Sequence, residues 1–469
     1  MRNLLLWLGV ALLASTGLSA CSSQSDKDCV RLTPSSRRCA RPGFAADPPP
    51  PASLPTVSAA PASTVSVAPS PSAAWSITTP EHPLAGLPTL RETVWTSARP
   101  PFDTYDFVAL RCIAMGEQGQ RLPERPVVVL FPGAHQHGEI IEPREQADWR
   151  LYLAARGIET WTVDYRTHYV TREQILDSRF MQAWTTEAFV DDAVAAIRQV
   201  REVSGQAKVF VGGFGLGATF AALAAARTGG EGIAGIVLLD GYVLDPLDAD
   251  AFYRQRPPTP NWFADDLEGH YLPYKRWIKI LQDVIDDPNG PDFFPEPMFD
   301  NRAQALAHFL YVSSAFGGRG GLSNAKNGRA DVVALARMFQ RQDRYWPRAQ
   351  NHGGFELKRH LAGARFDYET AFKTLQLPLL AFSSDTMDNA GMAWSERVHF
   401  TAQATSTSDV EFRVLHDWGH LDILFGSEAA QEVFAPMAEW IGRHAGGERR
   451  QEGASAPGQK RLPIRKMEK

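Results

Sequence analysis

The sequence has few cysteines, little net charge and no N-terminal apolar run long enough for a membrane span. Its 469 residues contain 4 cysteines, and their spacing does not resemble a zinc-type cluster. The formal net charge of -5 gives no reason to expect a nucleic-acid partner. With 44% hydrophobic and 22% charged residues, the composition is that of a soluble globular protein. We expect no metal and no cofactor.

The first twenty residues have the layout of an export signal. Arg2 precedes a short apolar stretch, Leu4 to Ala14, and small residues follow it. The step Leu18-Ser19-Ala20-Cys21 resembles the bacterial lipobox, which implies that Cys21 becomes the lipid-modified first residue of the mature chain. An ordinary signal peptide with an incidental cysteine is the alternative. We therefore expect a lipoprotein signal at 1–20 and an anchor on the non-cytoplasmic side of a bacterial membrane, in the cell envelope.

Export would place the other cysteines in an oxidising compartment. Cys29 and Cys39 flank a short polar loop, so a disulfide between them is plausible but not required. Cys112 lies in the apolar run Phe107–Met115, and we interpret it as a small buried residue.

Composition divides the rest of the chain. Residues 21–79 are rich in Pro, Ala and Ser, which predicts a disordered, extended spacer. Strand and helix patterns alternate over 80–242 and return over 367–444, and these two parts are predicted to form one core. The segment 243–366 is helical and aromatic and is predicted to be a cap inserted above the sheet. The polar, weakly basic end, 445–469, is predicted to be a disordered tail.

Within the core, uninterrupted apolar runs are typical of strands covered on both faces. Their alternation with segments of helical spacing predicts the α/β class, with a mostly parallel sheet flanked by helices. The predicted strands are Phe107–Met115, Val127–Phe131, Glu159–Asp164, Val209–Val211, Ile233–Leu239, Leu377–Phe382 and Val410–Leu415, and the predicted helices are Trp149–Arg156, Phe189–Val203, Ala218–Arg227 and Ala429–Ile441.

One segment combines a strand, a sharp turn and a helix of small residues, and it spans Val209 to Ala218. Its spacing resembles the nucleophile elbow G-x-S-x-G of the α/β-hydrolase fold. The resemblance implies that Gly213 and Gly217 permit a close approach of strand and helix. The middle position, where the family carries its serine, is Gly215. Glycine has no nucleophile, so an acyl-enzyme is not expected at this residue.

The resemblance extends to the loop after the strand Val127–Phe131, which contains Pro132-Gly133-Ala134-His135. In the family such a loop supplies backbone N–H groups to an oxyanion hole. The resemblance assigns this role to the amides of Ala134 and His135 and to the amide of Leu216. A simple tight turn is the alternative for the loop.

Two segments after the cap complete the resemblance, which covers about residues 80–443. Phe382-Ser383-Ser384-Asp385 follows a predicted strand, where the family places its triad acid, so Asp385 is the first candidate and Asp388 the second. His420 lies in a Gly-His step between the last strand and the last helix and fits the catalytic histidine. Such a pair can abstract a proton without a serine.

The same glycines permit a rival interpretation. Gly213-x-Gly215-x-x-Ala218 matches the dinucleotide-binding pattern, and Asp240 would then bind a ribose. The pattern usually lies near the first strand of its domain, whereas several elements precede it here, so we prefer the hydrolase interpretation.

The sequence thus favours a pseudo-hydrolase that binds an apolar or ester-like small ligand under its aromatic cap. The alternatives are a hydrolase that uses an activated water or another nucleophile, such as Thr219, Ser383 or Ser384, and a lyase or oxygenase that relies on a His420–Asp385 pair.

Overall fold

The structure is a computed structural model of the 469-residue chain, and it describes one compact part of it. The described residues are 74–116, 125–133, 136–141, 143–170, 180, 183–244, 267–294, 296–312, 320–324, 326, 328–342, 366–389 and 392–445. The predicted signal, spacer and tail lie almost wholly outside these residues, as do Cys21, Cys29 and Cys39. None of the described helices combines the length and apolar character that crossing a bilayer requires.

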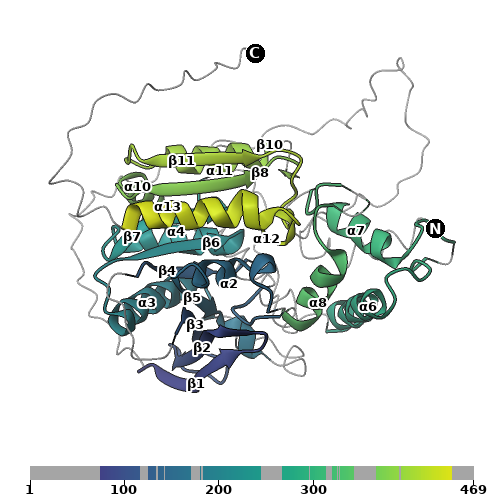
Figure 1. Ribbon diagram of the computed structural model, residues 1–469, viewed down its shortest axis with the longest axis horizontal. Coiled ribbons are helices and arrows are strands. Elements are labelled where there is room, and N and C mark those ends of the chain that lie inside the picture. Colours follow the sequence, from purple (N-terminus) through teal and green to yellow (C-terminus); the bar gives the residue numbers. More distant parts are fainter. Residues whose placement is uncertain are drawn as a thin grey trace, which may run out of the picture. The chain divides into compact units, whose positions relative to one another are not determined.

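The described core is built on a 9-stranded sheet with the order β1-β2-β3-β5-β4-β6-β7-β8-β11 (Figure 1). The strands from β5 to β11 pair in parallel, and those from β1 to β5 pair antiparallel. The bounds are β1 (Ser76–Leu84), β2 (Leu87–Ala98), β3 (Phe107–Met115), β4 (Val127–Phe131), β5 (Glu159–Asp164), β6 (Val209–Phe214), β7 (Ile233–Leu239), β8 (Leu379–Ser384) and β11 (Val410–Leu415). The mostly parallel α/β sheet predicted from the sequence is therefore confirmed.

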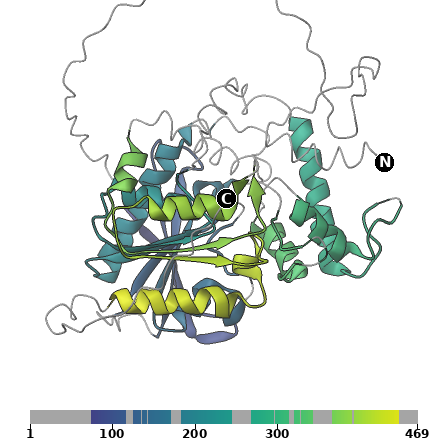
Figure 2. The same ribbon diagram turned by 90° about the horizontal axis from the view of Figure 1, so that it is seen from above.

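Helices cover both faces of the sheet (Figure 2). One face packs on α3, α4, α10 and α11, and the other packs on α2, η7 and α13. Every residue of β4 and β6 is buried, as expected for strands covered on two sides. The bounds are α2 (Trp149–Ala154), α3 (Thr186–Ser204), α4 (Leu216–Arg227), α10 (Tyr368–Lys373), α11 (Trp394–Gln403), α12 (Asp422–Phe425), η7 (Ala430–Phe434) and α13 (Ala435–Ala445), with short 3-10 turns η1 (Glu145–Ala147) and η2 (Arg166–Tyr169) and a two-stranded ribbon of β9 (Asp388–Asn389) and β10 (Met392–Ala393).

One predicted boundary is wrong. β1 begins at Ser76, inside the segment assigned to the spacer, and pairs with β2 as an antiparallel hairpin. The first five residues of β1 are exposed, so they lack the buried pattern by which the other strands were predicted.

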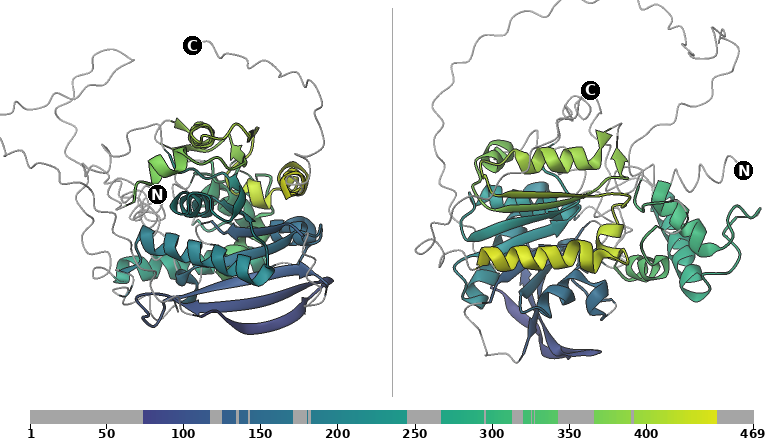
Figure 3. Two further views of the ribbon diagram at one scale, coloured as in Figure 1. Left: turned by 90° about the vertical axis from the view of Figure 1, so that its left-hand side faces the viewer. Right: turned by 45° about the horizontal axis from the view of Figure 1, so that its top comes forward.

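The described part of the 243–366 insertion is helical, and its helices form a small core of their own. They are α6 (Leu267–Asp286), α7 (Arg302–Val312) and α8 (Val332–Gln342), which Figure 3 shows grouped together. Their apolar cluster also takes in Leu421 and packs against Ile141, both from the sheet-bearing part of the chain. We call these helices and residues 320–330 the cap.

Candidate functional site

Gly215 forms the turn between β6 and α4 in a conformation that side chains rarely adopt. Its φ is 53° and its ψ is -119°. Its N–H donates to the carbonyl of Leu239 at 2.8 Å, which ties the turn to the neighbouring strand β7. A residue with a Cβ would be strained here, whereas glycine is not.

The two outer glycines, Gly213 and Gly217, pack directly against the backbone of neighbouring segments. A Cβ on Gly213 would lie 2.2 Å from the carbonyl carbon of Gly217. A Cβ on Gly217 would lie 1.9 Å from the carbonyl oxygen of Phe131, at the end of β4. No side chain fits at either position, so these glycines allow α4 to start directly against the strands.

The side chain of His420 lies against this turn. Its Nε2 atom is 3.0 Å from the position of a Cβ on Gly215. The imidazole stacks on Phe214, with ring centroids 4.4 Å apart, and also contacts Trp394. His420 is 7% exposed, so its ring is held in a nearly closed site between β11 and α12.

The carboxylate partner of His420 is Asp240, and the predicted pairing with Asp385 is wrong. The Nδ1 atom of His420 lies 2.7 Å from Oδ2 of Asp240, which follows β7 and is fully buried. Asp385 instead lies 2.9 Å from Nδ1 of the exposed His416 and accepts the N–H of Asp417 at 2.8 Å. The side chain of the second candidate, Asp388, lies outside the described residues.

The strand order explains the difference. β7 lies directly beside β6, the strand that leads into the turn at Gly215, whereas β8 is one strand further away. A residue at the end of β7 is therefore nearer to the turn than Asp385, which follows β8. The sequence did carry a signal for Asp240, since it follows a buried strand as Asp385 does.

The last two residues of β8, Ser383 and Ser384, also hold the carboxylate of Asp240. The hydroxyl of Ser383 donates to Oδ1 at 3.0 Å, and that of Ser384 donates to Oδ2 at 2.7 Å. The amide of Ser384 also donates to Oδ1, at 2.8 Å. These bonds fix the carboxylate and leave it oriented toward His420. The rival assignment of Asp240 to a ribose is thus not supported.

The amides of Ala134 and His135 lie outside the described residues, but the loop is described on both sides of them. On one side, Tyr165 donates its hydroxyl to the carbonyl of Pro132 at 2.8 Å. On the other, the N–H of Gly138 donates to Oδ1 of Asp164 at 2.6 Å. Leu216, the third predicted amide, is the first residue of α4.

The carboxylate of Asp164 lies in a buried cluster of charged and aromatic groups. Oδ2 accepts from Nε of Arg111 at 2.8 Å. Burial favours the neutral carboxyl, but the charge of Arg111, with contributions from His168 and His137, outweighs it and lowers the pKa of Asp164. The ionised form therefore holds the loop through Gly138.

The cap is joined to the segment that carries His420 by a second buried carboxylate, Asp422. It accepts the N–H groups of Gly419 at 2.9 Å, Ser323 at 2.7 Å and Arg329 at 3.1 Å. Next to it, the N–H of His420 donates to the carbonyl of Gly320 at 3.0 Å. The position of the histidine backbone is thus tied to the cap.

Among the described residues, no group of three or more His, Cys, Asp or Glu side chains is placed to hold a metal ion. Cys112 is partly buried in β3, and burial raises the pKa of its thiol well above the usual value. A protonated thiol is a poor nucleophile, which agrees with a packing role.

A scan against protein-family models and a search of curated proteins found no match. Among solved structures, the chain is similar to a candidate lipase from Sulfolobus solfataricus, with 22% identity, a TM-score of 0.58 and coverage of 79% of this chain and 99% of that one. The chain is also similar, with a TM-score of 0.40, to a thermophilic esterase from Thermogutta terrifontis, with 16% identity and coverage of 73% of this chain and 96% of that one. For an α/β-hydrolase-fold protein from Nakamurella multipartita the TM-score is 0.39, with 15% identity and coverage of 73% of this chain and 98% of that one. Together with the sheet topology and the turn at Gly215, the first similarity shows that the described part of the chain has the α/β-hydrolase fold.

Proposed function

We propose that the protein is a pseudo-hydrolase, which binds an apolar or ester-like ligand and forms no acyl-enzyme at residue 215. The observation that carries this proposal is the place of Gly215. It occupies the turn that faces Nε2 of His420, where an attacking hydroxyl would be needed, and it has no side chain. The fold is that of esterases and lipases, but residue 215 has no nucleophilic atom for the covalent step that is usual in this fold.

Nearby hydroxyls do not replace the missing one. Thr219, one turn into α4, donates its hydroxyl to the carbonyl of Tyr242 at 2.8 Å. The hydroxyls of Ser383 and Ser384 both donate to the carboxylate of Asp240. Each of these groups already has a structural role, which argues against the alternative nucleophiles.

Proton transfer by the His420–Asp240 pair is the second candidate function. Asp240 is placed to hold the imidazole in one tautomer, as a general base requires. The pair could then act on a water molecule, or on a substrate carbon as in a lyase or an oxygenase. We rank it second because general base catalysis alone contributes only about 10²–10⁴-fold in rate.

Turnover of short and long p-nitrophenyl esters by the purified chain tests the proposal. We expect no turnover above that of His420→Ala. Turnover that His420→Ala abolishes would show that the pair is active and would overturn the pseudo-hydrolase proposal. In a second arm, Gly215→Ser is expected to gain labelling by a fluorophosphonate probe, provided that His420 moves by a few tenths of an ångström to admit the Cβ. Gly442→Ser, on the exposed side of α13, is the matched control.

We further propose that the protein is exported and anchored through a lipid on Cys21. The lipobox-like step Leu18-Ser19-Ala20-Cys21 supports this proposal. Mass spectrometry of the N-terminal peptide from a bacterial host is expected to show an acylated cysteine, and the chain is expected in the membrane fraction. Cys21→Ser would release it, whereas Cys29→Ser would not. An unmodified Cys21 in membrane-free material would contradict the anchor.

A further inference from the structure

A strip of the cap runs alongside the segment that carries His420. We call residues 320–324 and 328–330 of the cap the strap, and residues 417–427 the His420 segment. Where the two pair, the N–H of His420 donates to the carbonyl of Gly320 at 3.0 Å. The strap is therefore hydrogen-bonded to the residue whose imidazole forms part of the candidate site.

The pairing extends along the chain beyond His420. The N–H of Leu421 donates to the carbonyl of Gly321 at 2.8 Å, and farther on Ala330 forms a β-bridge with Gly426. Backbone hydrogen bonds of this kind fix the register of two segments, whereas apolar contacts are not directional and allow the segments to slide. The strap therefore sets where the His420 segment lies along its own length.

Before the histidine, the two backbones touch directly. A Cβ on Gly419 would lie 2.3 Å from the carbonyl carbon of Leu322, so only glycine fits there. Arg329 adds side-chain contacts, since its Nε donates to the carbonyl of Asp417 at 3.2 Å and its Cζ lies 5.3 Å from the ring centre of Trp418. The His420 segment is thus held on both sides of the histidine.

Asp422 joins the two ends of the strap to the His420 segment, and its side chain is fully buried. Its Oδ2 accepts the N–H groups of Ser323 at 2.7 Å and Gly419 at 2.9 Å, while its Oδ1 accepts the N–H of Arg329 at 3.1 Å. One carboxyl group therefore bridges both ends of the strap and the residue directly before His420. Hydrogen bonds from one rigid group to two segments fix the placement of each segment relative to the other.

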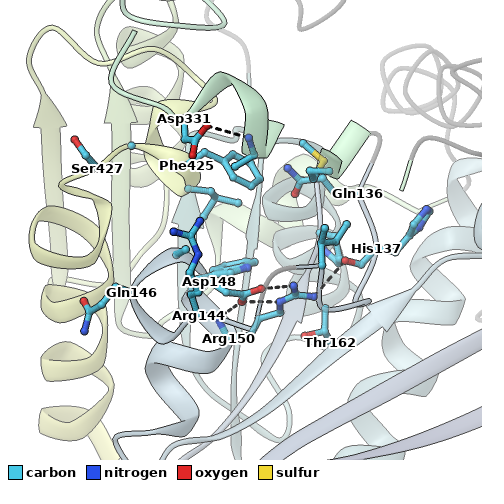
Figure 4. Close-up of a pocket in the computed structure, with 18 residues that line it drawn as sticks. Gln136, His137, Arg144, Gln146, Asp148, Arg150, Thr162, Asp331, Phe425 and Ser427 are labelled. Atoms are coloured by element: carbon cyan, nitrogen blue, oxygen red, sulfur yellow. Dashed lines mark hydrogen bonds and ion pairs between the residues drawn. The ribbon is translucent and has the colours of Figure 1, made fainter. Parts of the chain in front are cut away.

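Next to these contacts, a cavity of about 360 Å³ separates the cap from the core (Figure 4). Phe425 and Ser427 line it from the His420 segment, and Ala334 and Met338 line it from α8. Side chains do not hold each other across an open space, so the relative placement of the two parts depends more on the hydrogen bonds at the strap. Asp422 makes three of these bonds.

We propose that Asp422 is a positioning residue for His420, through which the position of the cap sets the position of the imidazole. A movement of the strap away from the core would carry the backbone of His420 with it and draw Nε2 away from residue 215. The cap is then not an independent lid, because it cannot open at the strap without displacing the histidine. The inference rests on the place of His420 in the site of the proposed function, but not on whether that site turns over a substrate.

Hydrogen exchange of the full-length chain, followed by mass spectrometry of its peptides, tests the coupling. In the wild type, peptides from the strap and from the His420 segment are expected to open with one shared free energy. Asp422→Leu should speed exchange in both about 10- to 100-fold, the range that corresponds to losing a hydrogen bond to a charged group. Asp422→Asn keeps one acceptor oxygen and should speed exchange less. Peptides from β6 and α4 should exchange as in the wild type.

The imidazole itself gives a readout that a purely structural role would not change. The downfield proton resonance of Nδ1–H of His420 should shift or broaden in Asp422→Leu, and less in Asp422→Asn. Asp331→Asn is the matched control, because Asp331 lies directly before α8 and accepts the N–H groups of Val333 and Ala334 at 2.9 Å and 3.0 Å. It should loosen the start of α8 and leave this resonance unchanged.

Two results would overturn the inference. One is an unchanged resonance in Asp422→Leu with faster exchange confined to the strap, which would leave Asp422 a structural residue of the cap. The other is independent opening of the strap and the His420 segment in the wild type. If Asp422→Leu does not fold, Asp422→Asn decides, and an unchanged resonance there counts against the inference. Since neither measurement requires turnover, esterase activity of the wild type would contradict the proposed function alone.

Discussion

The Nε2 atom of His420 lies 3.0 Å from the point that a Cβ atom would occupy on Gly215. This separation is tighter than most real Cβ contacts, so the imidazole partly fills the space that a side chain would need. The ring is held from behind by Phe214 and Trp394. Glycine at this turn therefore permits both the unusual backbone conformation and the close approach of the His420 side chain.

Replacing Gly215 by alanine should destabilise the protein. Its φ of 53° is unfavourable for a residue with a Cβ, and His420 would have to move, so we expect a loss of about 1–3 kcal/mol in the free energy of unfolding. Chemical denaturation measures it. As a control, Gly442→Ala in α13 places a Cβ that meets nothing within 4 Å, and it should stabilise by about 0.5–1 kcal/mol. Equal effects at both positions would argue against the strained turn.

The pairing of His420 can be tested by proton NMR of histidine-labelled chain. In Asp240→Asn the imidazole loses its charged partner, so the downfield resonance of a hydrogen-bonded Nδ1–H should disappear. Asp385→Asn, which removes the partner of the exposed His416, should leave that resonance in place. The opposite result would restore Asp385 as the acid of the pair. Asp240→Asn should also destabilise by about 1–3 kcal/mol, since its donors are buried.

Strands that are buried on two faces are among those that the sequence predicts well. Val127–Phe131 and Ile233–Leu239 are apolar along their whole length, so both the strands and their ends can be predicted from the sequence. Ser76–Leu84 is not, because it is an edge strand and exposes most of its residues. The turn could also be predicted from the spacing of Gly213, Gly215 and Gly217, because the backbone contacts at Gly213 and Gly217 leave no room for a side chain.

The acid of the site could not be chosen from the sequence alone. Asp240 and Asp385 both follow buried strands, and chain order does not say which strand end adjoins β6. That depends on the lateral order of the strands, which places β7 before β8. Asp422 is a further case, because its partners Ser323 and Arg329 are about a hundred residues away in the chain. Long-range pairings of this kind leave no local pattern.

Asp164 is expected to stabilise the fold only while it is ionised. Burial disfavours its charge, but Arg111 and the nearby histidines lower its pKa, so the native state binds the proton less tightly than the unfolded chain. Stability from this group is then present above the unfolded pKa of about 3.9 and is lost as the pH falls toward the native value. Urea denaturation of Asp164→Asn should show a deficit of about 1.5–3 kcal/mol at neutral pH. This deficit should shrink below about pH 4. A pH-independent deficit would contradict it.

Asp422 should show the opposite dependence on pH. Burial of its carboxyl raises the pKa, although the N–H groups of Gly419, Ser323 and Arg329 oppose the shift. The native state therefore binds the proton more tightly than the unfolded chain, and the stability from this group falls as the pH rises from about 4 through the native pKa. Relative to Asp422→Asn, the wild-type chain should lose about 1.4 kcal/mol for each unit by which the pKa is raised. Urea denaturation of both chains between about pH 4 and pH 8 measures this difference. A difference that grows with pH would mean that the three amides outweigh burial, and that the joint between the cap and the His420 segment is strongest with the carboxylate ionised.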